Sequence, residues 1–253
     1  DLYAAKSGEE LVKEQSYVFQ DRGGEWITLR PELTPSLARM VAQQQGQLSF
    51  PLRWWSFGPM WRYERPQKGR TREFFQWNID LVGVDTPEAD AELVAVAAEF
   101  LKVTGLNSDQ VVLKVNDRRL VEAELLRLDI QKSQFPGVFR LIDRLEKLRT
   151  DDWRKYGMDE IGISAEQLDG ILNIVANDRL WETSEKMTRF FAALRALGVS
   201  DFIEYDPRIV RGLQYYTGIV FEAWDRDGNF RAVLGGGRYD HLVEDVGGEP
   251  LSG

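Results

Sequence analysis

Hydrophobic and polar residues alternate along two stretches of the chain, one on each side of a short basic segment. In residues 73–80, a period of two places three apolar side chains on one face and three polar ones on the other, namely Phe75, Trp77 and Ile79, and Gln76, Asn78 and Asp80. In the preceding stretch Arg62 and Glu64 share one face, while Trp61 and Tyr63 share the other. This pattern predicts a β-hairpin in which both strands turn polar side chains toward the same side.

The connection between these two strands is cationic. Four basic residues crowd into it, Arg65, Lys68, Arg70 and Arg72, and Gly69 supplies the bend. Basic groups at this density are typical of a clamp for several phosphates. The alternative is an ordinary hairpin with a solvated tip, but the polar inner face on both strands favours a binding site.

A second hairpin and a helix are predicted before this segment. Residues 17–29 alternate around two adjacent glycines, which accept the positive φ of a tight turn. Thr34 and Pro35 then read as an N-cap followed by a proline in the first helical turn. We therefore expect a helix from there to about residue 44.

Helical and strand periods follow one another beyond the basic hairpin. Thr86 and Pro87 repeat the signal of a cap and a proline. The predicted helices are 88–103, 120–128, 137–148, 165–175 and 183–197, and the predicted strands include 111–115 and 202–205. A last hairpin over 215–234 contains an Asp-Gly turn and runs into three glycines, against whose bare backbone a ligand can lie.

These elements predict an α+β fold, an antiparallel β-sheet flanked by helices, with a helical insertion. We expect residues 1–115 and 200–253 to form the sheet-containing core, and residues 116–199 to form the inserted subdomain. The chain starts without a methionine and stops in a glycine-rich stretch. We therefore expect the core to be incomplete at both ends.

Composition excludes several classes of site. The 253 residues include no cysteine and a single histidine, so disulfides, thiolate metal sites and an ordinary zinc site are excluded, and a serine–histidine or cysteine–histidine catalytic pair nearly so. No hydrophobic run is long enough to span a bilayer, and the N-terminus does not read as a signal peptide. These features predict a cytoplasmic protein with no membrane partner.

The formal net charge of −9 is not that of a protein whose whole surface binds nucleic acid. Any contact with RNA must therefore be local. The basic cluster between Arg62 and Arg72 is suited to that, because it concentrates an anionic ligand at one cleft of an acidic protein.

Four segments, in order along the chain, resemble the histidyl-tRNA synthetases, a family of class II aminoacyl-tRNA synthetases. Arg62 and Glu64, followed by Arg-Pro-Gln-Lys-Gly-Arg and Arg-Glu-Phe-x-Gln, resemble motif 2 of that class. Residues 28–34 are similar to the segment that holds the amino group of histidine, residues 210–222 to the histidine-specific signature, and residues 234–240 to the strand that follows it. The motif 1 and motif 3 segments of the family are not found in the chain.

The resemblance implies a class II catalytic fold and a histidine–tRNA ligase. Such an enzyme joins L-histidine to ATP to give histidyl-adenylate, and then transfers the histidyl group to the 3′ end of tRNA(His). It also implies a homodimer in the intact protein, with a helical insertion that closes over the tRNA acceptor stem. The alternatives are a non-catalytic histidine-sensing regulatory subunit of ATP phosphoribosyltransferase, and a fragment that only folds or binds partners.

Adenylate formation adds negative charge around the α-phosphate, so cations are needed on both sides of it. By resemblance Arg62 and Arg211 supply them and are the catalytic residues. Glu64 accepts from the adenine amino group, Arg70 holds the γ-phosphate, and Arg72 is a second phosphate contact. Bound ATP implies Mg²⁺, but no acidic pair in the sequence stands out as its ligand.

The resemblance also assigns the histidine pocket. Glu32, Thr34 and Gln76 are implied partners of the α-amino group, and Asp80 and Tyr216 of the two imidazole nitrogens. Family members often carry glutamate where Asp80 stands. The full implied set is Glu32, Thr34, Arg62, Gln76, Asp80, Arg211, Tyr215 and Tyr216. The imidazole ring of histidine has one nitrogen that donates and one that accepts a hydrogen bond, so a pocket specific for it needs a polar group on each side.

Other chemistry-bearing residues are assigned structural roles. Tyr215 and Tyr216 are core aromatics in the alternative interpretation, where strand alternation turns only one of them inward. His241, the sole histidine, lies in a predicted loop and is discounted as a general base. The tryptophans, including Trp54, Trp55, Trp61 and Trp77, are predicted to lie in the core.

Overall fold

The computed structural model describes residues 15–66, 69–210 and 215–253, and the chain divides into two compact units. The first unit holds residues 1–89, 213–216 and 239–253, and the second holds residues 90–212 and 217–238. Two residues that the sequence analysis singled out, Lys68 and Arg211, lie outside the described residues.

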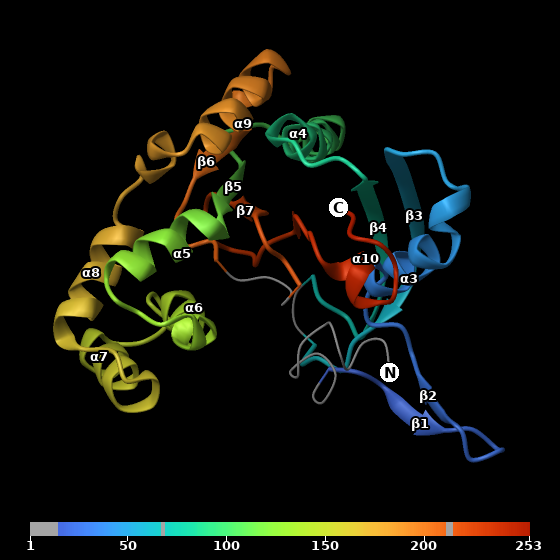
Figure 1. The fold of residues 1–253 in the computed structure, drawn as a ribbon, viewed down its shortest axis with the longest axis horizontal. Coiled ribbons are helices and arrows are strands. Elements are labelled where there is room, and N and C mark those ends of the chain that lie inside the picture. Colours follow the sequence, from blue (N-terminus) through green and yellow to red (C-terminus); the bar gives the residue numbers. More distant parts are fainter. Residues whose placement is uncertain (1–14, 67–68, 211–214) are drawn as a thin grey trace. The chain divides into compact units, whose positions relative to one another are not determined.

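Over its described residues, the first unit contains the hairpins β1–β2 and β3–β4 and the helices α3 and α10 (Figure 1). Its elements are β1 (Val18–Gln20), β2 (Trp26–Thr28), α3 (Thr34–Gln44), β3 (Leu52–Trp61), β4 (Glu73–Val82) and α10 (Leu242–Asp245), with a 3-10 turn at Gln45–Gln47. The turn between β1 and β2 has the predicted glycine at positive φ, Gly24 at +86°. The Asp21 side chain supports it by accepting from the backbone N–H of Gly23 at 2.8 Å.

Strands β3 and β4 form one long antiparallel ribbon. Gly58 lies opposite Gln76, Ser56 opposite Asn78 and Trp54 opposite Asp80. Because directly opposed residues share a face, this register places the polar residues of β4 on one side, the inner face. Packed against the end of that face is a buried cluster that includes Leu37, Val41, Leu52, Val82, Tyr215, Tyr239, Leu242 and Val243. The inner face therefore lies under α3 and α10.

The other face of the ribbon is aromatic and exposed. Trp55 is 71% exposed, Phe57 and Phe75 are each 63% exposed, and Trp77 is 43% exposed. The prediction that the tryptophans lie in the core is wrong for Trp55 and Trp77, and also for Trp54, which is 37% exposed. The side chains of Trp55 and Trp77 point away from the polar face, and no described part of the chain buries them.

Two further details of this unit differ from the sequence predictions. Strand β3 ends at Trp61, so Arg62 and Glu64 lie beyond it and are not set by strand alternation. Helix α3 has the predicted bounds, but its N-cap position is Leu33 and no side chain caps it. The Thr34 side chain instead makes a hydrogen bond with Tyr215, so the residue predicted as a cap faces the site.

The second unit combines a four-stranded sheet with helices. The longer elements are α4 (Pro87–Val103), which begins at the unit boundary, β5 (Val111–Asp117), α5 (Arg118–Arg127), α6 (Phe135–Asp143), α7 (Thr150–Tyr156), α8 (Ala165–Val175), α9 (Glu185–Ala196), β6 (Ile203–Tyr205), β7 (Ile219–Asp225) and β8 (Leu234–Gly237). Short turns of 3-10 helix lie at Lys132–Gln134, Leu180–Thr183 and Ser200–Phe202, and a π turn at Gly157–Ile161. In the described ranges no helix is both long and apolar enough to cross a membrane.

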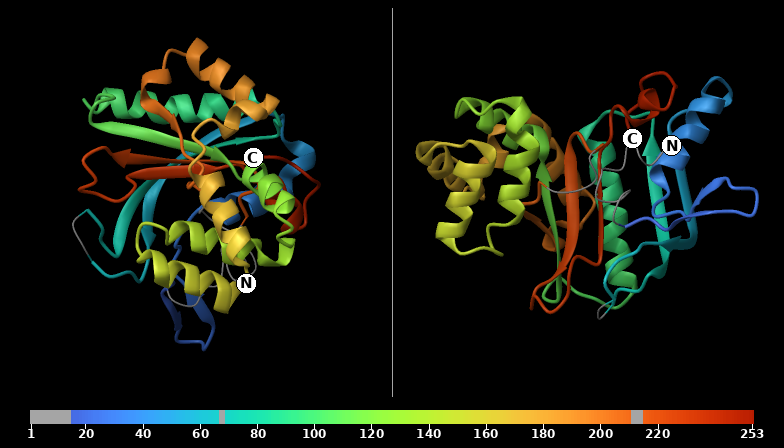
Figure 2. Two further views of the ribbon diagram at one scale, coloured as in Figure 1. Left: turned by 90° about the vertical axis from the view of Figure 1, so that its left-hand side faces the viewer. Right: turned by 90° about the horizontal axis from the view of Figure 1, so that it is seen from below.

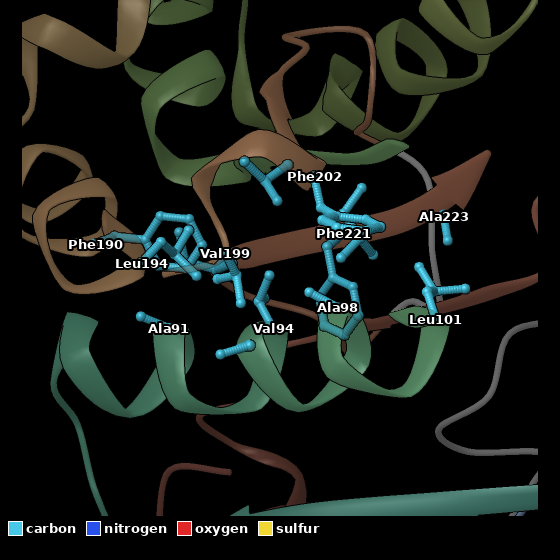
Figure 3. Packing of buried hydrophobic residues seen from close by; sticks show 14 of the residues in the cluster. Ala91, Val94, Ala98, Leu101, Phe190, Leu194, Val199, Phe202, Phe221 and Ala223 are labelled. Carbon is cyan, nitrogen blue, oxygen red and sulfur yellow. The ribbon is translucent and has the colours of Figure 1, made fainter. Parts of the chain in front are cut away.

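The sheet has the order β6-β5-β7-β8, with β5 and β6 parallel and the other pairs antiparallel. Helices α4 and α9 cover it. Ala91, Val94, Ala98 and Leu101 line one side of α4 and point toward the sheet (Figure 3). Phe190 of α9 is fully buried in the same cluster. This spacing of apolar residues is that of a helix lying on a sheet. Sheets with largely antiparallel pairing and helices packed on them are what the α+β prediction expected, and it is confirmed.

Helices α5, α6, α7 and α8 form a second group with its own core (Figure 2). Val121, Leu125, Leu141, Trp153 and Leu168 are each 1% exposed or less. Helix α8 has the predicted bounds, because Ser164 and Gln167 close a capping box at its start. The predicted helix 137–148 instead ends at Asp143, and the unpredicted α7 follows. That residues 116–199 form an insertion remains a prediction, since the structure groups them with β5 to β8.

Strand β8 contains Leu234 and the three glycines into which the last hairpin was predicted to run. Gly235, Gly236 and Gly237 pair with Glu222, Phe221 and Val220 of β7. A Cβ on Gly236 would lie 2.7 Å from the Phe221 ring. Gly236 therefore lets that ring lie against the strand.

Candidate active site

Two buried carboxylates and two tyrosines form the centre of the site in the first unit. Glu32 is 3% exposed and accepts a hydrogen bond of 2.7 Å from the Tyr215 hydroxyl. Asp80 is 8% exposed and accepts one of 2.9 Å from the Tyr239 hydroxyl. The two tyrosine rings pack edge to face, with centroids 6.0 Å apart. We call these four residues the tyrosine–carboxylate cluster.

Burial dominates the electrostatics of this cluster. Loss of hydration raises the pKa of Asp80 from 3.8 to about 6, and the hydrogen bond from Tyr239 partly offsets that rise. Burial also raises the pKa of the Tyr215 and Tyr239 phenols well above 10. Both phenols therefore remain donors at neutral pH, and the two carboxylates are available to an amino group or a ring N–H.

The inner face of β4 adds two amides beside the cluster. Within the described residues, Gln76 Oε1 and Asn78 Nδ2 are buried and have no hydrogen-bond partner. A buried polar atom left without a partner costs about 1–3 kcal/mol, which folded proteins tolerate mainly where a ligand or water completes the bond. Opposite Gln76 stands Gly58, and a Cβ added there meets nothing within 4 Å. The inner face thus has both unused polar groups and room above them.

Arg62 lies at the end of the ribbon even though β3 stops one residue earlier. Its backbone N–H donates to the Arg72 carbonyl at 2.9 Å. Its Nε donates to the Pro31 carbonyl, also at 2.9 Å, and its guanidinium lies 5.4 Å from the centroid of the Phe74 ring. Phe74 shares the inner face with Gln76. Arg62 is thus held between the 28–34 segment and the polar face.

Arg70 and Arg72 of the same hairpin both contact residues that follow Arg62. Arg70 Nη1 lies 2.8 Å from Glu64 Oε2. Arg72 stacks on Tyr63 at 4.4 Å and donates to the Glu64 carbonyl at 3.2 Å. In this structure Arg70 and Glu64 therefore pair with each other, and their predicted contacts with ATP stay predictions. The predicted bend at Gly69 is present, with φ of +74°.

Among the predicted histidine-pocket residues, the described ones of the first unit lie close together. Tyr216 packs edge-on against Tyr215 at 5.1 Å, and neither is in a strand, because β7 begins at Ile219. Strand alternation therefore does not decide which of them faces inward. Arg211 lies outside the described residues, and its role stays a prediction.

Sequence reasoning missed Tyr239, Phe74 and the unused amide of Asn78. Tyr239 lies in the 234–240 segment that the sequence analysis singled out. The sequence did not indicate which residue its hydroxyl binds. The partner, Asp80, is 159 positions away in sequence. Only the fold brings the two together.

A cavity of about 530 Å³ lies along β3 in the same unit. It is lined by Thr28, Leu29, Arg30, Leu33, Ser36 and residues 56–61. Its lining includes Ser56 and Gly58, which lie opposite Asn78 and Gln76 on the inner face, but not Glu32, Gln76 or Asp80.

Tyr239→Phe is expected to raise the pKa of Asp80 further above 6, by about one unit, because the lost hydrogen bond stabilises the ionised carboxylate. Carbon-13 NMR titration of the aspartate carboxyls measures this directly. Tyr63→Phe, at an exposed ring, is the control and leaves the titration unchanged. An unshifted Asp80 in Tyr239→Phe would show that the phenol does not stabilise the carboxylate.

Comparison with known proteins agrees with this geometry. A sequence model described as "Histidyl-tRNA synthetase" matches residues 2–252. The chain belongs to the histidyl-tRNA synthetase family. Curated relatives include the "Histidine--tRNA ligase, chloroplastic/mitochondrial" of Arabidopsis thaliana, 40% identical over 98% of this chain and 53% of its own length, and the histidine–tRNA ligase of Thermoplasma volcanium, 41% identical over 96% and 59%.

Solved structures show the same family fold. The histidyl-tRNA synthetase from Nostoc sp. PCC 7120 superposes with a TM-score of 0.77 at 25% identity, over 94% of this chain and 58% of its own. A Bacillus halodurans structure titled as an ATP phosphoribosyltransferase regulatory subunit/histidyl-tRNA synthetase gives 0.80 at 24% identity, over 99% and 67%. The predicted class II fold is thus confirmed.

The chain spans 53% to 61% of the length of the curated relatives named as histidine–tRNA ligases that head the comparison. It therefore represents one part of the family's length. The four ordered motifs and the tyrosine–carboxylate cluster all lie within that part.

Proposed function

We propose that the protein carrying this chain is a histidine–tRNA ligase, which uses ATP to activate L-histidine and transfers it to tRNA(His). The tyrosine–carboxylate cluster is the observation that carries this proposal. It offers two buried anions to a substrate that has one ammonium group and one ring N–H, as histidine does. Membership of the family and relatives named as histidine–tRNA ligases support it.

In this proposal the histidine lies on the inner face of β4. Glu32, Thr34 and Gln76 bind its ammonium group, and Asp80 binds the ring N–H. Tyr216 binds the other ring nitrogen, and Tyr215 lines the same pocket. The unpartnered Gln76 Oε1 supports this orientation, because an acceptor is what an ammonium group needs.

Arg62 and Arg211 are proposed to neutralise the charge that develops on the α-phosphate when the carboxylate of histidine attacks it. Arg62 has its guanidinium held beside the inner face by Pro31 and Phe74. A preorganised donor of this kind stabilises a transition state by about 3 kcal/mol. Glu64, Arg70 and Arg72 are proposed to bind the adenine and the outer phosphates.

Mg²⁺ is proposed to arrive with the nucleotide. In the part of the chain that the structure describes, no three His, Cys, Asp or Glu side chains are grouped so as to hold a metal ion. We therefore assign the ion no ligand among these residues and no step of the reaction. A cytoplasmic location, a homodimer and a tRNA-covering role for the 116–199 segment also remain proposals.

A histidine-sensing regulatory subunit is the less favoured alternative. The curated relatives at about 40% identity are named as ligases, and the proposed ATP-binding residues Arg62, Glu64 and Arg70 are present. The Bacillus halodurans structure shares the fold at 24% identity, which does not separate the two functions.

Pyrophosphate exchange tests the proposal. The full-length protein is expected to exchange labelled pyrophosphate into ATP only when histidine is present, and Arg211→Ala to lower the rate about 100-fold while histidine binding is kept. No exchange with histidine, or equal exchange with other amino acids, would reject the ligase. An equal loss of histidine affinity in Arg211→Ala would make Arg211 a substrate anchor.

A further inference from the structure

We propose that Asp90 is a positioning residue, which holds the Arg238 side chain and so fixes the backbone beside two tyrosines of the proposed histidine pocket. The two tyrosines are Tyr216 and Tyr239. This inference rests on the proposed function and deepens it. Asp90 lies in none of the four motif segments, and none of them gives the Arg238 side chain a role.

Asp90 and Arg238 form a two-pronged ion pair within the second unit. Arg238 Nη2 lies 2.9 Å from Asp90 Oδ1, and Arg238 Nε donates to Oδ1 at 3.0 Å and to Oδ2 at 3.2 Å. The Arg238 side chain is 3% exposed and that of Asp90 15%, so water screens the pair little. A pair with two parallel bonds fixes the direction of a guanidinium as well as its distance. The first turn of α4 therefore holds Arg238 in one orientation.

The carboxylate of Asp90 is charged at neutral pH. Burial raises its pKa from 3.8 to about 6, and the charge and hydrogen bond of Arg238 and the charge of Arg119 partly offset that rise. The charge of Asp117 adds to it, and Asp117 is itself paired with Arg119 at 3.3 Å. The ion pair between Asp90 and Arg238 is therefore formed under the conditions of the proposed reaction.

The backbone of Arg238 carries this restraint to both tyrosine segments. Its N–H donates to the Ile219 carbonyl at 2.8 Å, and its carbonyl accepts from the Thr217 N–H at 2.8 Å. That carbonyl belongs to the peptide bond that precedes Tyr239. The Thr217 N–H belongs to the peptide bond that follows Tyr216. The two segments are thus bonded to each other directly beside these tyrosines.

Gly218 brings the same segment against the Arg238 side chain. A Cβ on Gly218 would lie 3.0 Å from Arg238 Cδ and 2.6 Å from Arg119 Nη2. The chain after Thr217 therefore packs closely on the side chain that Asp90 holds. Because packed groups move together, displacement of the guanidinium would displace this segment as well.

Tyr239 reports on this restraint through Asp80. Its hydroxyl donates to the Asp80 carboxylate at 2.9 Å, and this bond lowers the pKa of Asp80 against the larger effect of burial. A hydrogen bond weakens steeply when its donor moves out of line. If Asp90 positions Tyr239, loss of the ion pair will be seen in the titration of Asp80.

The test measures the pKa of Asp80 in Asp90→Asn by carbon-13 NMR titration of the full-length protein, with Asp80→Asn to identify the signal. The pKa should rise by about half a unit, because the phenol of Tyr239 no longer donates in good geometry. Loss of a negative charge at position 90 acts through space in the opposite direction, so a rise reports on the hydrogen bond. In a Tyr239→Phe background the same substitution should no longer raise the pKa.

Histidine binding gives the functional readout. Asp90→Asn should raise the Kd for histidine about 5-fold or more and change the Kd for ATP less than about 2-fold. Asp90→Glu keeps the carboxylate and should recover most of the histidine affinity and of the Asp80 pKa. Glu99→Gln, which breaks an exposed ion pair with Lys102 on the same helix, is the control and should change neither.

Arg238→Lys is the second variant, since removal of one partner from a buried pair can prevent folding. It keeps the charge but loses the two-pronged bond, so it should give a smaller rise of the Asp80 pKa. Circular dichroism reports whether each variant is folded. If Asp90→Asn does not fold, the result with Arg238→Lys decides.

Three outcomes would overturn the proposal. They are an unmoved Asp80 pKa in the folded variants, an equal rise in the Tyr239→Phe background, and a raised pKa with unchanged histidine affinity. A wild type that does not bind histidine would instead reject the ligase, whereas the Asp80 titration would still decide whether Asp90 positions Tyr239.

Discussion

Arg62→Ala is expected to lower the rate of histidine-dependent pyrophosphate exchange by about 100-fold or more. The guanidinium is held beside the inner face by its bond to Pro31 and its contact with Phe74. In the proposed reaction it is therefore preorganised for the charge that appears on the α-phosphate, and such a donor lowers a barrier by about 3 kcal/mol. The fall should appear in kcat more than in the KM for histidine.

Two further variants make this prediction specific. Arg62→Lys keeps the charge but loses the planar fork, so only part of the activity should return. Arg22→Ala removes an exposed arginine from the β1–β2 turn and should leave the rate unchanged. If Arg62→Ala raises the KM values and leaves kcat intact, Arg62 binds the ground state and is not catalytic.

Asp80→Asn is expected to weaken histidine binding by roughly 1–3 kcal/mol, or about 10- to 100-fold in Kd, with little change for ATP. The buried carboxylate accepts from Tyr239 and is proposed to accept from the ring N–H as well. An amide in its place makes a weaker, neutral bond. Isothermal titration with histidine and with ATP separates the two sites, and unchanged histidine binding would remove Asp80 from the pocket.

The same variant should have the opposite effect on stability. Because the pKa of Asp80 rises from 3.8 to about 6 on folding, its contribution to stability is present below pH 3.8 and is lost as the pH rises through about 6. Asp80→Asn should therefore be more stable than wild type at pH 7.5, by up to roughly 3 kcal/mol, with the difference gone near pH 4. Denaturant unfolding at both pH values measures it. If the variant is equally destabilised at both pH values, burial of the ionised Asp80 carboxylate does not cost stability.

Helix caps and strand alternation, which involve residues close in sequence, predicted several elements correctly. Helix α8 has its expected bounds because Ser164 and Gln167 cap it, and the alternation along β4 correctly placed Gln76 with Asp80 on one face. Helix α7 was missed, because the predicted helix 137–148 was extended past the end of α6 at Asp143 and no helix was predicted over residues 150–156.

Features that depend on distant contacts were not predicted. Residue type suggested that Trp55 and Trp77 are buried, but burial depends on what covers a sheet face, which one strand's sequence does not show. Three glycines were predicted at the end of a strand, but the sequence did not show that all three pair with β7. Tyr239 and Asp80 are brought together by the fold alone.

The alternation along β4 also restricts how its gene can change. Loss or gain of one codon between Glu73 and Val82 would reverse the faces beyond that point, turning Asp80 outward and a large aromatic or aliphatic side chain toward the ligand. Substitutions at Phe75 or Trp77 leave the polar set in place, whereas the spacing of Gln76, Asn78 and Asp80 tolerates no single-residue insertion or deletion. Divergence of this strand is therefore expected to proceed by replacement of outward residues at constant length.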